Sequence, residues 1–176
     1  MDNSFLRSVI AREPKTLNSL QPNEFRLVFS RIPNVVYFCQ SANLPGIGIN
    51  EFVVPAPFAT QIRRPAGGLT YDNFDMNFIV SEDMANWREI YNWITEITPT
   101  TSLNYGYDKY RDNFSDATLI IMNNSSKPFY AIKFKDCFPT SIGSITFETQ
   151  VVDIPPVICN VSFAYTGYSV EDLTLS

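Results

Sequence analysis

The chain has 176 residues, a length that fits one domain with a sizeable hydrophobic core of its own. Its net charge of −5 argues against a protein that captures nucleic acid on a basic face, because such capture needs a dense array of Lys and Arg. The absence of His excludes His-containing catalytic triads and zinc sites, and it removes the most common general acid and base.

The three cysteines, Cys39, Cys137 and Cys159, are far apart and form no CxxC pair. This spacing favours buried, reduced thiols in a cytosolic protein over a metal site or a disulfide framework. The first residues lack the basic start and apolar run of a signal peptide, and no apolar stretch is long enough to span a bilayer. We therefore expect no membrane insertion, and assembly in the cytoplasm.

Residues 1–22 are predicted to form an N-terminal arm. Within it, Phe5, Leu6, Val9 and Ile10 would share one side of a short helical turn. Two interpretations remain open: a frayed terminus, or docking of this apolar patch onto the protein's own core or a neighbouring molecule.

Two strands are predicted next, over 24–30 and 35–42. In the first, Phe25, Leu27 and Phe29 alternate with polar or exposed positions. A short turn separates the two runs, so the pattern predicts a hairpin.

A long segment, 46–70, follows a Leu-Pro-Gly turn that ends at Gly46. Its prolines confine any strand there to an edge or an irregular hairpin, with short extended pieces over 50–55 and 59–64. Loops of this length inside a compact domain are often functional. We expect an extended loop or arm.

Residues 73–81 alternate strictly and predict a strand, after which the period changes. Apolar residues then recur at spacings of three and four, which predicts one amphipathic helix at about 82–97 with Ser81 as its N-cap. The Tyr-rich loop 100–116 resembles a stacking platform for sugars or nucleic acid, but its aspartates favour ordinary loop packing.

The last third returns to strands, over 117–123, 127–137, 145–150 and 157–168, followed by a short polar tail. Strands, one helix and strands again predict a mostly β fold of two packed antiparallel sheets, a sandwich or barrel, with the helix flanking it. The whole chain, 1–176, is expected to be a single domain.

No sequence motif predicts chemistry. There is no phosphate-binding glycine loop, and the acidic pairs have no signature that distinguishes them from a solvated surface. We therefore expect no enzyme, and no catalytic, cofactor-binding or metal site.

Several stretches together resemble the tail tube proteins of contractile-tailed, T-even-like bacteriophages, and they extend over nearly the whole chain from residue 21. They are "QPNEF" (21–25), "FCQSANLPG" (38–46), "IRRPAGGLTYDNFDMNFIVSED" (62–83), "CFPTSIGSITFET" (137–149) and "VSFAYTGY" (161–168).

This resemblance implies a structural subunit of the virion tail. Hexameric rings would stack into a hollow tube, with sheath and baseplate proteins as partners, and DNA would pass through the lumen into the host without specific binding. Contacts between subunits would come from the N-terminal arm and from the long loop. The residues expected in the loop contacts are Phe52, Val53, Val54, Phe58, Arg63 and Arg64.

Two alternatives stay open. The N-terminal arm, the 100–116 loop and the tail depart from the family pattern, which leaves room for a baseplate tube initiator or a tail-end ring of the same fold. A more distant alternative is a β module that binds carbohydrate or peptide through the 100–116 loop.

Overall fold

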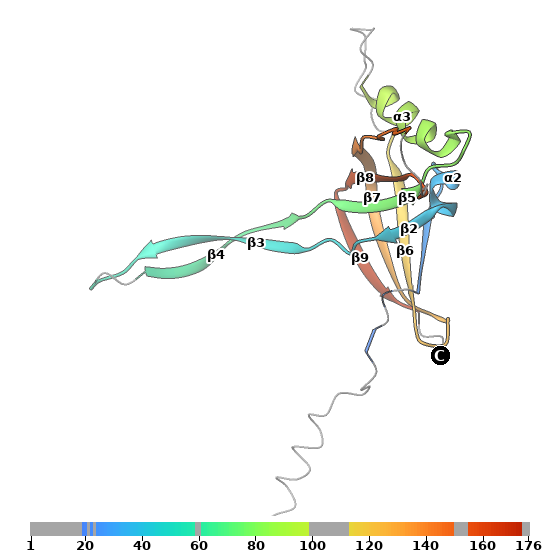
Figure 1. Cartoon of the computed structure of the whole chain (residues 1–176). Coiled ribbons are helices and arrows are strands. Elements are labelled where there is room, and N and C mark those ends of the chain that lie inside the picture. The colour runs from blue at the N-terminus through green and yellow to red at the C-terminus, as the bar shows by residue number, and fades with distance from the viewer. Residues whose placement is uncertain are drawn as a thin grey trace, which may run out of the picture.

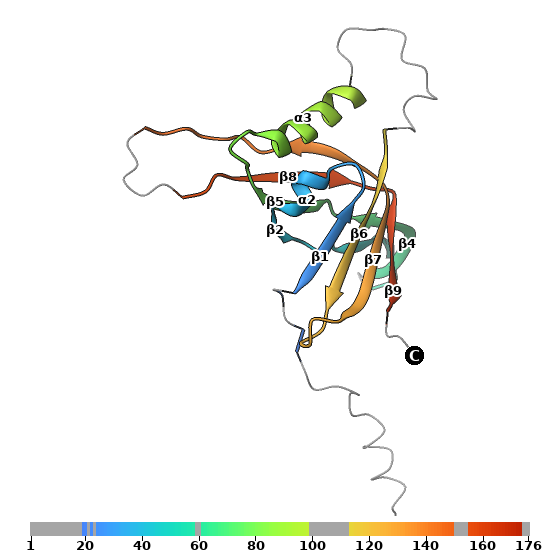
Figure 2. The ribbon, with the colours of Figure 1, turned by 90° about the vertical axis from the view of Figure 1, so that its right-hand side faces the viewer.

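The computed structural model describes residues 19, 20, 22, 24–58, 61–98, 113–149 and 155–173. Most of these residues form a two-layered β body from which a long hairpin projects (Figures 1 and 2). The strands are β1 (Phe25–Phe29), β2 (Cys39–Ala42), β3 (Ile47–Pro55), β4 (Gln61–Tyr71), β5 (Phe74–Ile79), β6 (Ser115–Met122), β7 (Pro128–Ile142), β8 (Ile158–Ala164) and β9 (Gly167–Asp172). The helices are α2 (Pro33–Tyr37) and α3 (Ala85–Ile97).

The body is one hydrogen-bonded path that folds into two antiparallel layers. Its strand order is β1-β6-β7-β8-β5-β2, and β9 pairs with β7. The long strand β7 belongs to both layers, because its first half pairs with β6 and β9 and its second half pairs with β8. The change of layer coincides with Asp136, whose positive φ of 54° bends the strand. The predicted two packed antiparallel sheets are confirmed.

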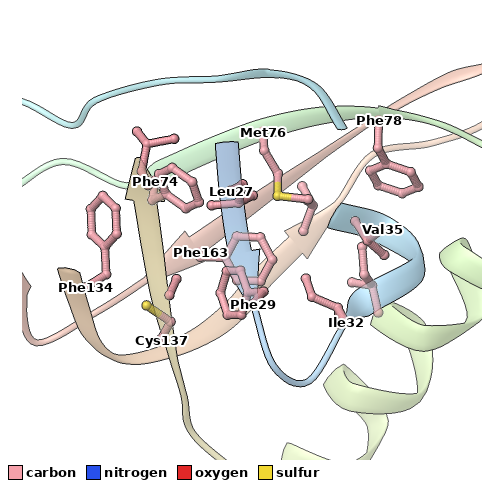
Figure 3. Packing of buried hydrophobic residues seen from close by; sticks show 14 of the residues in the cluster. Leu27, Phe29, Ile32, Val35, Phe74, Met76, Phe78, Phe134, Cys137 and Phe163 are labelled. Atoms are coloured by element: carbon pink, nitrogen blue, oxygen red, sulfur yellow. The ribbon is translucent and has the colours of Figure 1, made fainter. Parts of the chain in front are cut away.

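The core lies between these layers and is rich in aromatic rings (Figure 3). Phe29 and Phe163 approach within 5.1 Å between ring centroids, and Phe74 and Phe134 within 4.8 Å. All four side chains are buried, and burial of each contributes about 1.5–3 kcal/mol. The strict alternation of β5, with Phe74, Met76 and Phe78 facing inward, agrees with the sequence prediction.

The predicted helix is present as α3, but it starts three residues later than expected. Ser81 is not its N-cap. The cap position is Met84, which adopts a left-handed conformation with φ 52°. The start is instead secured by the fully buried Asn86, whose Nδ2 donates to Ile79 O (2.7 Å) and whose Oδ1 accepts from Trp87 N (2.8 Å). An internal amide thus fixes the helix to the end of β5.

One predicted strand was partly wrong. Within 35–42 only β2 is extended, while Pro33–Tyr37 forms the short helix α2. Pro33 suits the first position of a helix, and the turn buries Val35 completely, so tertiary packing overrides the strand preference of the two valines. The predicted hairpin of 24–30 with 35–42 is also wrong, because β1 pairs with β6 and β2 pairs with β5.

Other segments also differ from the sequence predictions. The segment 46–70 is a regular hairpin rather than a loop, and 145–149 is not a strand. The run 157–168 is divided between β8 and β9, because the chain turns where Thr166 N donates to Lys135 O at 3.0 Å. The first half of the predicted polar tail therefore lies in β9. The strands over 117–123 and 127–137 are confirmed as β6 and β7.

Candidate assembly surfaces

The arm, which we define as β3, β4 and the turn between them, is the outer continuation of the β2–β5 hairpin. Figure 1 shows it leaving the body as a twisted two-stranded ribbon. β3 and β4 pair only with each other in the described structure. An isolated two-stranded hairpin is marginally stable in water, so contact with a further surface would stabilise the arm.

Apolar side chains of the arm are exposed to solvent. Those at least 45% exposed are Ile47, Ile49, Phe52, Val53, Phe58, Ile62 and Leu69. Such a concentration on one projecting element is typical of a protein interaction site rather than of a monomer's surface. The sequence prediction identified Phe52, Val53, Val54 and Phe58 but missed Ile47, Ile49, Ile62 and Leu69. The Ile47-Gly48-Ile49 alternation was the signal for a strand there.

The distal half of the arm has two different faces. Phe52 lies opposite Arg64 and Val54 opposite Ile62, so these four residues share one face. On the other face Arg63 Nη1 contacts Glu51 Oε1 at 2.8 Å. Arg63 is therefore paired within its own arm, whereas Arg64 has no carboxylate partner among the described residues.

The Leu-Pro-Gly turn forms the shoulder where the arm leaves the body. Pro45 is buried, and Asp72 N donates to Gly46 O at 3.1 Å as the arm's first cross-strand bond. A Cβ atom at Gly46 would lie 2.6 Å from Asp72 Oδ2, so a larger residue here would require the Asp72 side chain to move.

A polar band crosses the outer face of β2, β5 and β8. Asn77 Nδ2 donates to Ser41 Oγ at 2.9 Å, and Asn160 Nδ2 donates to Asn77 Oδ1 at 3.1 Å. These bonds join neighbouring strands through their side chains. Along this band, the exposed side of the sheet is therefore an ordered amide and hydroxyl surface.

Hydroxyl and carboxylate side chains lie beside this band on the same face of the sheet. Ser162 Oγ donates to the Asp75 carboxylate, and Ser141 lies opposite Ser162 on β7. β2, β5 and β8 contain no Lys or Arg, and Asp75 is their one charged residue. We name this surface the polar sheet face, defined by Ser41, Asp75, Asn77, Asn160 and Ser162.

The outer face of the other layer is different because it carries cations. Arg26 on β1 and Lys133 and Lys135 on β7 are all exposed there. Lys133 Nζ lies 2.7 Å from a carboxylate oxygen of Glu171 on β9. The outer face of this layer thus carries cationic side chains, one of them paired with Glu171, whereas β2, β5 and β8 carry none.

A second projection, formed by residues 143–149 and 155–157 in the described structure, extends from the ends of β7 and β8 near α3 (Figure 2). Its described residues line an apolar groove that includes Ile145, Phe147, Pro155 and Val157. Phe147 is 78% exposed. This groove is a further surface suited to protein contacts.

The described part of the chain holds no group of metal-ligating side chains, and no helix there is long and apolar enough to cross a membrane. Burial raises the pKa of the Cys39 thiol to about 11 and that of Cys137 to about 12. Both thiols are therefore protonated near neutral pH, in agreement with the predicted structural role.

The predicted contact residues fall into two groups. Phe52, Val53, Val54, Arg63 and Arg64 all lie on the arm, and Phe58 lies at its tip. Phe5, Leu6, Val9 and Ile10 lie outside the described residues, as does most of the Tyr-rich 100–116 loop.

Two antiparallel sheets, a projecting apolar arm and a cation-free polar face define a structural protein suited to assembly. The chain belongs to the phage tail tube protein family, whose model matches residues 9–171. The recognised family is thus confirmed, and the protein is a component of the phage tail.

Among known proteins, the chain is similar to the tail tube terminator protein of Enterobacteria phage T4. The two are 26% identical over 135 residues, which cover 75% of this chain and 76% of that protein. Among solved structures, the tube-terminating cap of the anti-feeding prophage matches with a TM-score of 0.65 and 13% identity, covering 94% of this chain and 99% of that chain. A chain of the sheath–tube complex of the extracellular contractile injection system PVC matches with a TM-score of 0.62 and 16% identity, covering 94% and 97%. These structural likenesses establish the fold.

Proposed function

We propose that copies of this chain form a hexameric ring that ends the tail tube, with the polar sheet face lining the lumen. The observation that carries the proposal is the contrast between the two outer faces of the body. One face has amides, hydroxyls and a single carboxylate, and the other has Arg26, Lys133 and Lys135. The name of the T4 relative supports a place at the end of the tube.

The contrast supports an arrangement in which the polar sheet face points inward. A wall that passes DNA must not hold phosphates, and cationic side chains are what hold them. Asn77 and Asn160 hydrogen-bond to each other and carry no charge, while Asp75 repels phosphate. DNA would therefore pass without specific binding, and the cationic layer would face outward, toward a sheath or other tail proteins.

The sheet edges supply a route to ring closure. In the β2-β5-β8-β7 layer, β2 ends the strand path on one side, and the second half of β7 borders β8 on the other. Pairing of β2 with β7 of the next copy is a head-to-tail contact, which closes into a ring when the rotation between copies divides a full turn. The inner layers would then join into one barrel.

The arm would bind the neighbouring copy. Residues 47–71 contain two arginines and one glutamate, so they carry a net charge of +1 while the rest of the chain carries −6. A basic, apolar hairpin therefore meets an acidic body, and Arg64 is available for a carboxylate on the neighbour. Burial of Phe52, Val54 and Ile62 in this contact would order the arm.

The proposal is tested by electron microscopy and light scattering of the purified protein. We expect single hexameric rings that do not elongate. A monomer at high concentration would overturn the proposal. A second experiment shortens the arm. Residues 51–64 are replaced by Asn-Gly, a two-residue turn that suits a short hairpin. The shortened protein should stay folded and monomeric, and ring formation by it would overturn the role of the arm.

A tube subunit is the second candidate, favoured by the family description that matches the chain. Purified chain that forms long hollow tubes would establish it. A mixture with the phage's main tube protein separates the remaining possibilities, because a terminator stops elongation and a baseplate initiator shortens the lag before it. The assembly itself would take place in the host cytoplasm.

A further inference from the structure

We infer that Tyr165 and Tyr168 are positioning residues that hold the arm at a fixed direction to the body before any partner binds. The inference deepens the proposed function, since it concerns how the arm is presented to a neighbouring copy. Tyr165 lies in the corner between β8 and β9, and Tyr168 is the second residue of β9. The arm leaves the body beside β9 (Figure 1).

The shoulder is a weak point in the hairpin ladder. Asn43 N donates to Asp75 O (3.0 Å) on the body side, and the next backbone bond, Asp72 N to Gly46 O (3.1 Å), lies on the arm side. The Asn43 side chain also joins the two strands here, since its Nδ2 donates to Asn73 O at 3.3 Å. Between these bonds the chain passes through Pro45, which has no N–H to donate. Without further contacts the ribbon would bend at this gap.

The two tyrosine hydroxyls make contacts across this gap, one to each strand. Tyr165 Oη donates to Asp72 O at 2.8 Å, and Tyr168 Oη donates to Pro45 O at 3.2 Å. Because each strand of the shoulder is held separately, the arm is restrained against both bending and twisting. A single contact would leave a pivot.

The rings reinforce the hydroxyl contacts. The ring of Tyr71, the last residue of β4, lies 5.7 Å from the rings of both Tyr165 and Tyr168. Those two rings in turn lie 5.1 and 5.5 Å from Phe134, which is fully buried in the core. The arm's inner end is thereby connected to the core through aromatic contacts.

The corner that carries the tyrosines is itself fixed to β7. Thr166 N donates to Lys135 O at 3.0 Å, and Thr166 Oγ1 lies 3.3 Å from Asp136 Oδ2. Asp136 N donates to Asp116 Oδ1 at 3.1 Å on β6. The tyrosines therefore extend from a rigid base, and the direction of the arm is set by the body.

A fixed arm lowers the conformational entropy lost when a neighbour binds it. Loss of both hydroxyls should therefore weaken association of copies by about tenfold while the fold persists. Burial raises the pKa of Tyr165 to about 12, so its hydroxyl remains a donor throughout the neutral range.

Single-molecule energy transfer at picomolar concentration, where copies are separate, tests the inference directly. Dyes are attached at Arg64→Cys on the arm and Lys127→Cys in the β6–β7 turn, with Cys39→Ser removing the half-buried thiol. The test variant is Tyr165→Phe with Tyr168→Phe. The control is Tyr71→Phe, whose hydroxyl has no hydrogen-bond partner among the described residues and which leaves the two bonds intact.

We expect one narrow transfer distribution for the parent and for Tyr71→Phe, and a broadened or shifted one for the double variant at an unchanged melting temperature. Identical distributions for all three would overturn the inference. If the double variant unfolds, Tyr168→Phe alone must still broaden the distribution. This measurement does not require a ring. A parent protein that never assembles would therefore contradict the proposed function, while the transfer distributions would still decide the positioning role of the two tyrosines.

Discussion

A lysine placed on the polar sheet face tests which layer lines the lumen. We predict that Asn160→Lys gives rings that retain linear duplex DNA but not closed circular DNA. Asn160 is exposed on the outer side of β8, so lysine fits without entering the core. The change removes the 3.1 Å bond to Asn77 and costs roughly 1 kcal/mol of folding free energy, which a domain of this size tolerates.

The number of added charges sets how much the affinity of the ring for linear DNA increases. Each copy adds one cation, so a hexamer adds about six on one ring of the wall, and the slope of log K against log salt should reach at most about −5. Fluorescence anisotropy over a salt series measures this slope for linear duplex. Closed circular DNA of the same sequence has no end and is unable to enter a closed ring.

The matched control is Thr118→Lys, which places the same charge on the outer face of β6, opposite Lys133. This variant should retain linear and circular DNA to the same extent. Equal retention of both DNA forms by Asn160→Lys would refute the assignment of the polar sheet face to the lumen, because the lysine would then lie on an outer surface.

Three further outcomes are expected. Phe163→Ala should lower the free energy of unfolding by about 3–5 kcal/mol, since its fully buried ring contacts other core rings, and urea denaturation measures this. Asn86→Ala should cost about 2–3 kcal/mol by leaving Ile79 O and Trp87 N without their buried partner; a melting temperature within 2 °C of the parent would contradict this. Between about pH 9 and pH 12 stability should fall, because the raised pKa values of Cys137 and Tyr165, each about 12, keep these groups protonated in the folded state after they ionise in the unfolded chain. Cys137→Ala should flatten the first part of that decline, and an unchanged decline would rule out the thiol as its cause.

Local patterns predicted much of the body. The alternation of β5 and the three- and four-residue spacing in α3 are short-range signals. Both predicted the correct element because each element buries one face. The strand preference of the Val35-Val36 pair misled the prediction, because Pro33 and the burial of Val35 beneath α3 favour a helical turn that only tertiary contacts reveal.

The arm and the polar sheet face needed the structure for a different reason. The prolines of 46–70 break the local strand pattern, yet they are tolerated because both strands of the hairpin have a free edge. The polar sheet face joins Ser41, Asn77 and Asn160, which are far apart in sequence and meet only through strand pairing. A local sequence pattern does not predict which residues of different strands lie opposite each other.

The shared strand β7 has a mechanical consequence. In a sandwich of two separate sheets, the layers touch only through side chains and slide when those side chains repack. Here β7 is hydrogen-bonded in both layers, so sliding would break backbone bonds to β6 and β9 on one side or to β8 on the other. A force applied to one layer is therefore carried along the covalent chain of β7 to the other layer, and the body responds to it as one stiff unit.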